Sequence, residues 1–443
     1  MRQSGARSAE EAGALPEELA RRLGTTDAVV VGLSAMIGAG VFAALAPAAE
    51  AAGYWLLASL AVAAVVAYCN ATSSARLAAR YPESGGTYVY GRRRLGPLWG
   101  YLAGWGFTVG KTASCAAMAL TFGAYVAPGL ARPLAIAAVV ALTVLNLYGV
   151  RRSAWVAKMI VAFVLAVLAA VIVVGFTGDS TVTFGWFAHT PPAEPFLTTS
   201  LAIGTAPAGV DAWGVLQAAG LLFFAFAGYA RIATLGEEVR DPARTIPRAV
   251  SIALGITLVV YALVAMGALR VLQPELLARS AAPLIDLVNE GGAGWLAPVV
   301  GAGAAVAALG ALLALLLGVS RTVLAMARER DLPGVLAAVD PVRQTPRRAE
   351  AAVGVAVIVL LLVADLRGAI GFSSFGVLVY YAIANACAFT LTREEGAPPK
   401  VVPVLGLGLC LVLAATLPAA SVLAGLAVFA VGLVIWLARH RSR

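Results

Sequence analysis

Glycines interrupt two apolar stretches that otherwise resemble continuous helices. Gly32, Gly38 and Gly40 fall in GLSAMIGAGVF, and Gly228 falls in FFAFAGYARIATLGEE. A helix broken inside a hydrocarbon layer exposes backbone N–H and C=O groups, which is tolerated only where a cavity or a ligand satisfies them. Freed amides at the positive end of a half-helix suit a carboxylate, and freed carbonyls suit an ammonium group. The pattern indicates a binding site for a zwitterion such as an α-amino acid. The alternative is that the glycines only allow two helices to pack closely.

Two cationic residues fall where charge is costly in a membrane. Lys111 lies in GWGFTVGKTASCAAMAL, with at least a dozen mostly uncharged residues on either side. It must therefore face an aqueous path or a partner, and burial favours its neutral amine, so that it could take up and release a proton. This predicts a coupling or cation-mimicking role for Lys111, with a structural hydrogen bond as the alternative. Arg231, just after the second break, is a gating candidate, or else it extends toward the interface or pairs with Glu237 or Glu238.

The elements that must position these residues are membrane-spanning helices. Of 443 residues, 61% are hydrophobic and 12% are charged, about half the roughly 25% charged content of soluble proteins. Several apolar runs approach the roughly 20 residues needed to cross a bilayer. The composition predicts an all-α integral membrane protein with about 12 transmembrane helices. The expected spans are residues 27–48, 54–75, 97–127, 132–150, 154–177, 213–239, 247–270, 294–327, 350–365, 368–392, 400–418 and 420–438.

The basic residues explain the net charge of +9 without a nucleic-acid partner. No Lys or Arg occurs between Lys158 and Arg231, whereas arginines cluster in alternate short connections. This positive-inside pattern predicts that both termini are cytoplasmic in a multi-pass protein of the cell (inner or plasma) membrane. No removable signal peptide is evident, and the four cysteines fall within expected spans, so they predict no disulfide framework.

The interrupted spans occupy the first place in two successive blocks of five, in opposite orientations. Interrupted helices in corresponding positions of two inverted halves are typical of a secondary transporter with a site near the bilayer midplane. The expected organisation is an N-terminal cytoplasmic tail (1–26), a first inverted repeat (27–177), an external loop (178–212), a second inverted repeat (213–392), two further helices (393–438) and a C-terminal tail (439–443).

Other chemistry finds little support in the sequence. It contains no GxxxxGK[ST] phosphate loop, no Cys/His spacing typical of a metal centre, and only His189 and His440 as histidines. We therefore predict no cofactor, no metal and no enzymatic activity. A channel would need a continuous polar lining, a membrane-embedded enzyme would need converging nucleophiles or carboxylates, and a nutrient sensor with a transporter fold would differ only in lacking flux.

Four stretches together resemble the amino acid–polyamine–organocation permease superfamily over nearly the whole chain. They are SAMIGAGVF, YPESGGTYVYGRRRLGPLWGYLAGW, FFAFAGYARIATLGEEVRDPARTIPRAV and, more weakly, GVSRTVLAMARERDLP. The resemblance implies two inverted five-helix repeats with broken helices 1 and 6, two added C-terminal helices, and alternating access. It implies that the backbone of Ile37, Gly38, Ala39 and Gly40 holds the substrate carboxylate, and that the backbone of Phe226, Ala227, Gly228 and Tyr229 holds its amino group. Phe226 and Tyr229 would line or gate the pocket, and Glu83 to Gly86 and Glu237 to Pro247 would be gate and hinge elements.

The sequence departs from this family at points that bear on substrate and coupling. Many relatives carry an acidic residue directly after the aromatic of the second motif, but here Ala230 and Arg231 follow Tyr229. This favours a neutral amino acid over the alternative of a cationic amino acid or polyamine, which would gain support if Glu50 faced the pocket. A lysine common midway along span five is replaced by Val164, so Lys158 is a weaker coupling candidate than Lys111. Residues 294–318 contain no Ser, Thr, Asn, Asp or Glu, which favours proton coupling or exchange over sodium coupling.

Overall fold

The computed structural model describes residues 24–81, 85–148, 154–178, 211–233, 239–340 and 345–441. Within these ranges the chain is helical and forms no β-strand. The α-helices are α1 (Thr25–Met36), α2 (Ala39–Ala43), α3 (Leu45–Ala52), α4 (Leu56–Arg80), α5 (Thr87–Arg94), α6 (Pro97–Val126), α7 (Ala131–Leu147), α8 (Ala154–Thr177), α9 (Ala212–Phe226), α10 (Ala230–Ala233), α11 (Pro242–Val271), α12 (Pro274–Arg279), α13 (Pro283–Glu290), α14 (Ala297–Arg328), α15 (Arg347–Val363), α16 (Leu366–Phe389), α17 (Val401–Thr416) and α18 (Ala419–Arg441). Short 3₁₀ turns are η1 (Gly53–Trp55), η2 (Pro128–Leu130), η3 (Ala227–Tyr229), η4 (Gly294–Leu296) and η5 (Gly334–Ala337).

The long helices have the length and composition of membrane spans. Nine stretches of helix among the described residues are apolar and long enough to cross a bilayer. Many large apolar side chains on α7, α15, α17 and α18 face outward, which suits lipid and not water. The chain is therefore a multi-pass helical membrane protein. Helices overlap each of the twelve expected spans, but α15 and α17 have 17 and 16 residues and α6 is less apolar, so the count of twelve stays a prediction.

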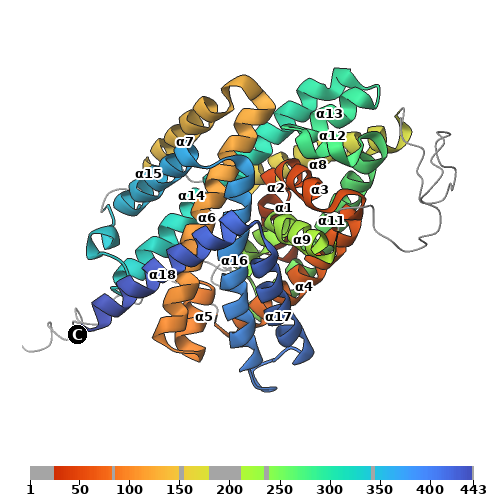
Figure 1. Cartoon of the computed structure of the whole chain (residues 1–443). Helices are drawn as coiled ribbons and strands as arrows, with labels where there is room; N and C mark the ends of the chain where they lie inside the picture. Colours follow the sequence, from red (N-terminus) through yellow and green to blue (C-terminus); the bar gives the residue numbers. More distant parts are fainter. Residues whose placement is uncertain are drawn as a thin grey trace, which may run out of the picture.

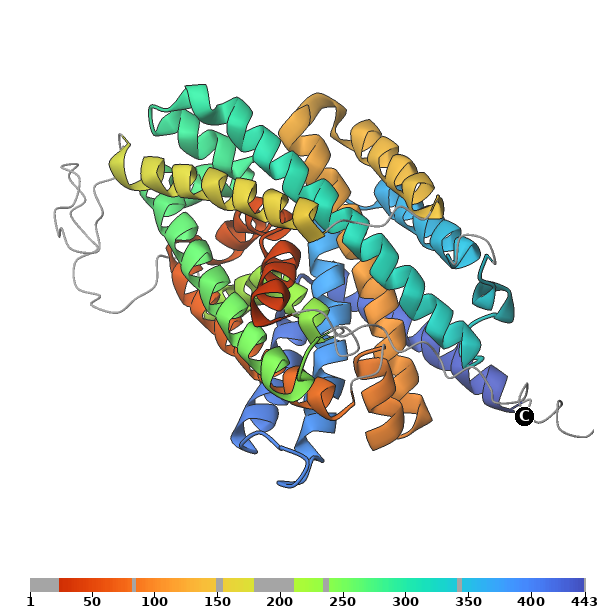
Figure 2. The same ribbon diagram turned by 180° about the vertical axis from the view of Figure 1, so that it is seen from behind.

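The bundle has two distinct ends and a shared centre (Figures 1 and 2). The α13 end carries α12 and α13, and the α5 end carries α5 and the connection between α16 and α17. The long helix α6 runs between the two ends and packs on α14 and α16. Glycines permit the close approach to α16, because a Cβ on Gly376 would lie 2.9 Å from the carbonyl oxygen of Gly106. Such small-residue crossings allow tight helix packing in membranes.

Both glycine-marked stretches are interrupted as helices. The first helix stops at Met36, where Ile37 and Gly38 leave helical geometry before α2 begins at Ala39. In the second, α9 ends at Phe226 and passes through the 3₁₀ turn η3 into the short helix α10. The expected span of residues 27–48 is thus divided among three short helices, and the helix expected to end at residue 239 is described only as far as Ala233.

Candidate functional site

A cavity of about 180 Å³ lies between α6, α14 and the two interrupted stretches. On α6 it is lined by Gly104, Phe107, Lys111, Ser114 and Met118, which recur every three or four residues and so share one face of the helix. The facing surface of α14 contributes mainly small residues, which leave the space open. These residues are Ala311, Ala314, Leu315, Gly318, Arg321, Thr322 and Ala325.

The cavity extends from the interrupted helices toward the α5 end. Ala35, Ala227 and Gly228 line it beside the two breaks, and Gly85 and Tyr88 line it beside α5. On α6 the lining stops at Met118, about two turns short of the α13 end. Arg321 lines the cavity and is also exposed, so the cavity communicates with solvent on the α5 side.

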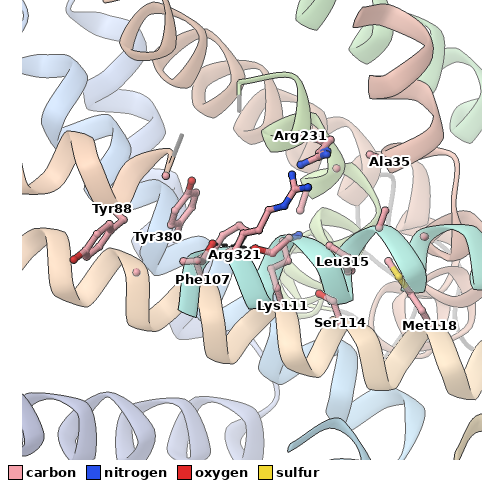
Figure 3. Close-up of a pocket in the computed structure, with 18 of the residues that line it drawn as sticks. Ala35, Tyr88, Phe107, Lys111, Ser114, Met118, Arg231, Leu315, Arg321 and Tyr380 are labelled. Atoms are coloured by element: carbon pink, nitrogen blue, oxygen red, sulfur yellow. Dashed lines mark hydrogen bonds between the residues drawn. The ribbon is translucent and has the colours of Figure 1, made fainter. Parts of the chain in front are cut away.

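Three cationic side chains line this cavity. Lys111 projects from α6, Arg231 from α10 and Arg321 from α14, and Figure 3 shows all three directed toward the same part of the cavity. None of the described residues that line the cavity is Asp or Glu. The described residues that line the cavity therefore include cations and no carboxylate.

Lys111 is the most enclosed of the three cations. Its relative exposure is 6%, and no other described residue forms a hydrogen bond or an ion pair with its amine. A buried ammonium group without a partner is energetically unfavourable. Lys111 lines the cavity, and the expectation that it faces an aqueous path or a partner stays a prediction.

Tyr261 on α11 joins the two interruptions. Its hydroxyl lies 2.5 Å from the carbonyl oxygen of Met36 and 3.2 Å from that of Ala225, so that it can donate to either. These carbonyls lie at the end of α1 and near the end of α9, where helical partners run out. The sequence analysis did not predict that Tyr261 bonds to both interrupted stretches. The signal for it was one tyrosine in the middle of an apolar span.

The eight backbone positions predicted to hold substrate have different surroundings. Ala227 and Gly228 line the cavity, whereas Ile37 lines a separate space of about 10 Å³ between α1, α8 and α14. Gly38, Ala39 and Gly40 are buried, and a Cβ on Gly40 would lie 2.6 Å from the Cα of Ala225. These glycines thus allow tight packing, and their backbone contact with substrate stays a prediction.

The two predicted gating aromatics are fully buried against other tyrosines. Phe226 packs on Tyr261 with ring centroids 5.2 Å apart, and Tyr229 packs on Tyr381 at 5.1 Å. Neither is among the residues that line the cavity. A gating role for them would need a conformation in which these ring contacts open.

The remaining charged residues singled out from the sequence lie away from the cavity or outside the described ranges. Lys158 forms an ion pair of 2.7 Å with Asp27, which ties α8 to the start of α1. Glu50 is exposed and pairs with Arg367. Glu83, Glu237, Glu238 and His189 lie outside the described residues.

At the α13 end, the hydroxyl of Tyr125 connects three elements. It donates to the carbonyl of Phe42 at 3.0 Å and accepts from the amide of Leu284 at 3.3 Å. The rings of Phe42 and Tyr125 also meet edge to face, 5.6 Å apart. These contacts hold α2, α6 and α13 together, and sequence reasoning did not anticipate them.

The α5 end is joined by ion pairs. The buried carboxylate of Asp331 accepts from Arg92 at 2.8 Å and from the Tyr88 hydroxyl at 2.7 Å. On the other side of α5, Arg94 donates to both carboxylate oxygens of Glu395, at 3.1 and 2.7 Å. The cavity therefore borders a helix that is anchored by charged contacts on two sides.

A helical membrane bundle with two interrupted helices beside a solvent-connected cavity belongs to the class of membrane transport proteins. Comparison with known families agrees, because residues 23–438 match the profile of the amino acid permease family. The chain belongs to this family, whose members are transporters of amino acids and not enzymes.

The relatives of this chain carry names that differ in the amino acids they specify. The chain is 63% identical over 424 residues to an uncharacterized transporter of Mycobacterium tuberculosis, covering 95% of this chain and 92% of the relative. It is 30% identical to the chloroplastic cationic amino acid transporter 7 of Arabidopsis thaliana, covering 84% and 66%. It is 25% identical to a branched-chain amino acid permease of Bacillus subtilis, covering 96% and 94%.

Proposed function

We propose that this protein is a secondary active amino acid transporter that works by alternating access across the cell membrane. The observation that carries the proposal is a cavity that, among the described residues, extends from two interrupted helices toward the α5 end of the bundle. Interrupted helices at a solvent-connected cavity are the architecture in which secondary transporters bind their substrates. In this proposal the chain has twelve spans arranged as two inverted repeats of five plus two, and both termini are cytoplasmic. The α5 end, which carries Arg92 to Arg94, then faces the cytoplasm.

The proposed substrate carries no net positive charge. The relatives include a cationic and a branched-chain amino acid transporter, so family membership leaves both classes open. The cavity lining contains Lys111, Arg231 and Arg321 and no described carboxylate, and like charges in a low-dielectric site repel each other strongly. A lysine-like or polyamine substrate would meet cationic side chains and no described carboxylate in the lining of the cavity.

Proton coupling or exchange is the proposed energy source, with Lys111 as the coupling residue. Lys111 lines the cavity, whereas the amine of Lys158 is paired with Asp27. The small space beside Ile37, where a cation between α1 and α14 would lie, offers only the Ser34 hydroxyl among its side chains, and that hydroxyl donates to the carbonyl of Val31. Hard cations prefer several oxygen ligands.

Uptake by liposomes containing the purified full-length protein tests this function. A pool of labelled amino acids is offered with an inward proton gradient, with a sodium gradient, and with amino acids preloaded inside. We expect uptake that the proton gradient or preloading drives and that lysine and arginine do not inhibit. Uptake driven by sodium alone would contradict the coupling, and inhibition by lysine would contradict the substrate class. Tight binding without flux under any of these conditions would indicate a sensor.

A further inference from the structure

The described lining of the cavity contains cationic side chains that the α-groups of a zwitterion would not balance. The α-carboxylate and α-ammonium groups of an amino acid cancel each other, and the breaks near Ala35 and Gly228 are where the proposed function places them. Lys111 and Arg321 lie in the same cavity. Arg231 has an interaction of its own, so the inference rests on Lys111 and Arg321 alone.

Lys111 is the observation that points to a ligand. Its side chain is more than nine-tenths buried and lines the cavity, and no described residue provides an anion or an acceptor for it. An apolar substrate side chain would leave this amine without a partner when the cavity closes to water during the proposed transport cycle. A basic side chain would add a further like charge. A negatively charged side chain supplies both the acceptor and the counter-charge that this amine lacks, and so makes the strongest partner.

The space around these cations also fits such a side chain. The cavity continues past Lys111 along α6 and α14, and Phe107 and Leu315 provide apolar surface there for methylene groups. Arg321 approaches from the opposite helix (Figure 3). A guanidinium group binds carboxylates with two parallel hydrogen bonds, and an ammonium group adds a compact point charge.

We propose that the transported amino acid carries a second carboxylate, on its side chain, and that Lys111 and Arg321 bind that carboxylate. This inference rests on the proposed function and narrows its cargo to acidic amino acids of the glutamate and aspartate type. In this arrangement the two breaks bind the α-groups, and the cationic part of the cavity selects the side chain.

Binding of glutamate and glutamine to the purified full-length protein provides the test, since the two ligands have nearly the same shape and differ in charge. We expect glutamate to bind roughly 10- to 100-fold more tightly, the range for a charged hydrogen-bonding partner. Equal binding, or preference for glutamine or leucine, would overturn the inference while leaving amino acid transport intact. Failure of all amino acids to bind would instead count against the proposed function.

Substitutions of Lys111 and Arg321 test whether these two residues cause the preference for glutamate over glutamine. Lys111→Met keeps the length of the side chain and removes its charge, so the preference for glutamate over glutamine should fall to about threefold or less. Lys400→Met is the matched control, because Lys400 donates to the carbonyls of Phe389 and Leu391 in the connection between α16 and α17, and it should keep the full preference. Arg321→Gln, at an exposed position, should reduce the preference in the same direction if Lys111→Met does not fold. Full preference in both cavity variants would refute the assignment.

Discussion

The two ends of the bundle are closed by different kinds of contact. At the α13 end, a neutral tyrosine hydroxyl bonds to backbone groups of α2 and α13. At the α5 end, side chains of opposite charge bond to each other across three elements. Neutral bonds to backbone hold fixed geometry and respond little to salt or pH, whereas ion pairs with partly exposed members are weakened by salt to the extent that water reaches them. We infer that the Tyr125 contacts seal the α13 end, whereas the partly exposed ion pairs of the α5 end can exchange with water.

Removing Asp331 should have the largest effect at the α5 end. Its carboxylate is buried and joins Arg92 and Tyr88, so Asp331→Ala leaves a half-buried guanidinium and a hydroxyl without their acceptor. We expect a loss of about 3 kcal/mol in the stability of the docked α5 helix. Hydrogen exchange of residues 87–94 in the purified protein measures this loss.

Glu329 provides the matched control for Asp331. It also pairs with Arg92, at 3.2 Å, but its side chain is 56% exposed. Because exposed pairs contribute about 1 kcal/mol or less, Glu329→Gln should leave exchange of α5 nearly unchanged. Equal effects of the two substitutions would mean that burial does not distinguish these carboxylates, and the description of the α5 end would need revision.

Loss of the Tyr125 hydroxyl should weaken the contacts of the α13 end, with a smaller loss of free energy than Asp331→Ala causes at the α5 end. Tyr125→Phe keeps the ring contact with Phe42 but leaves the Phe42 carbonyl and the Leu284 amide without their partner, at a cost of about 1–3 kcal/mol. We expect a cysteine introduced at buried Ala43 to react faster with a membrane-impermeant maleimide. Tyr54→Phe is the control, since Tyr54 is exposed and should not change the rate. Labelling at the wild-type rate in Tyr125→Phe would place the seal elsewhere.

The breaks could be predicted from sequence because glycine and a charge inside an apolar run are local signals. Gly38 and Gly228 marked the interruptions, and Lys111 marked the cavity. The direction in which Tyr229 points could not be predicted, because it lies in the 3₁₀ turn η3, which replaces regular helical periodicity there.

Contacts between residues that are distant in the chain could also not be predicted from the sequence. Lys158 and Asp27 are 131 positions apart, and Tyr261 bonds to carbonyls of two other helices. A hydroxyl or an amine in an apolar span signals that a partner is needed, but only the packing of the whole bundle determines which group supplies it. For the same reason, the sequence did not predict that Arg321 lines the cavity. In the sequence, Arg321 is an ordinary basic residue near the end of a helix.

The smallest expected effect concerns pH at the α5 end. Hydrogen bonds from Arg94, then from the Thr392 amide, lower the pKa of Glu395 from its ordinary value of 4.5 to about 2. A carboxylate whose pKa is lower in the folded protein contributes its stability in full above about pH 4.5 and loses it as the pH falls toward 2. Glu395→Gln should therefore lower the thermal midpoint slightly and by a constant amount between pH 5 and 8, and the difference from wild type should shrink below about pH 4. A difference that changed between pH 6 and 8 would show that the α5 end titrates in the physiological range, and would remove the contrast between a coupling residue inside the cavity and pH-insensitive ion pairs at its border.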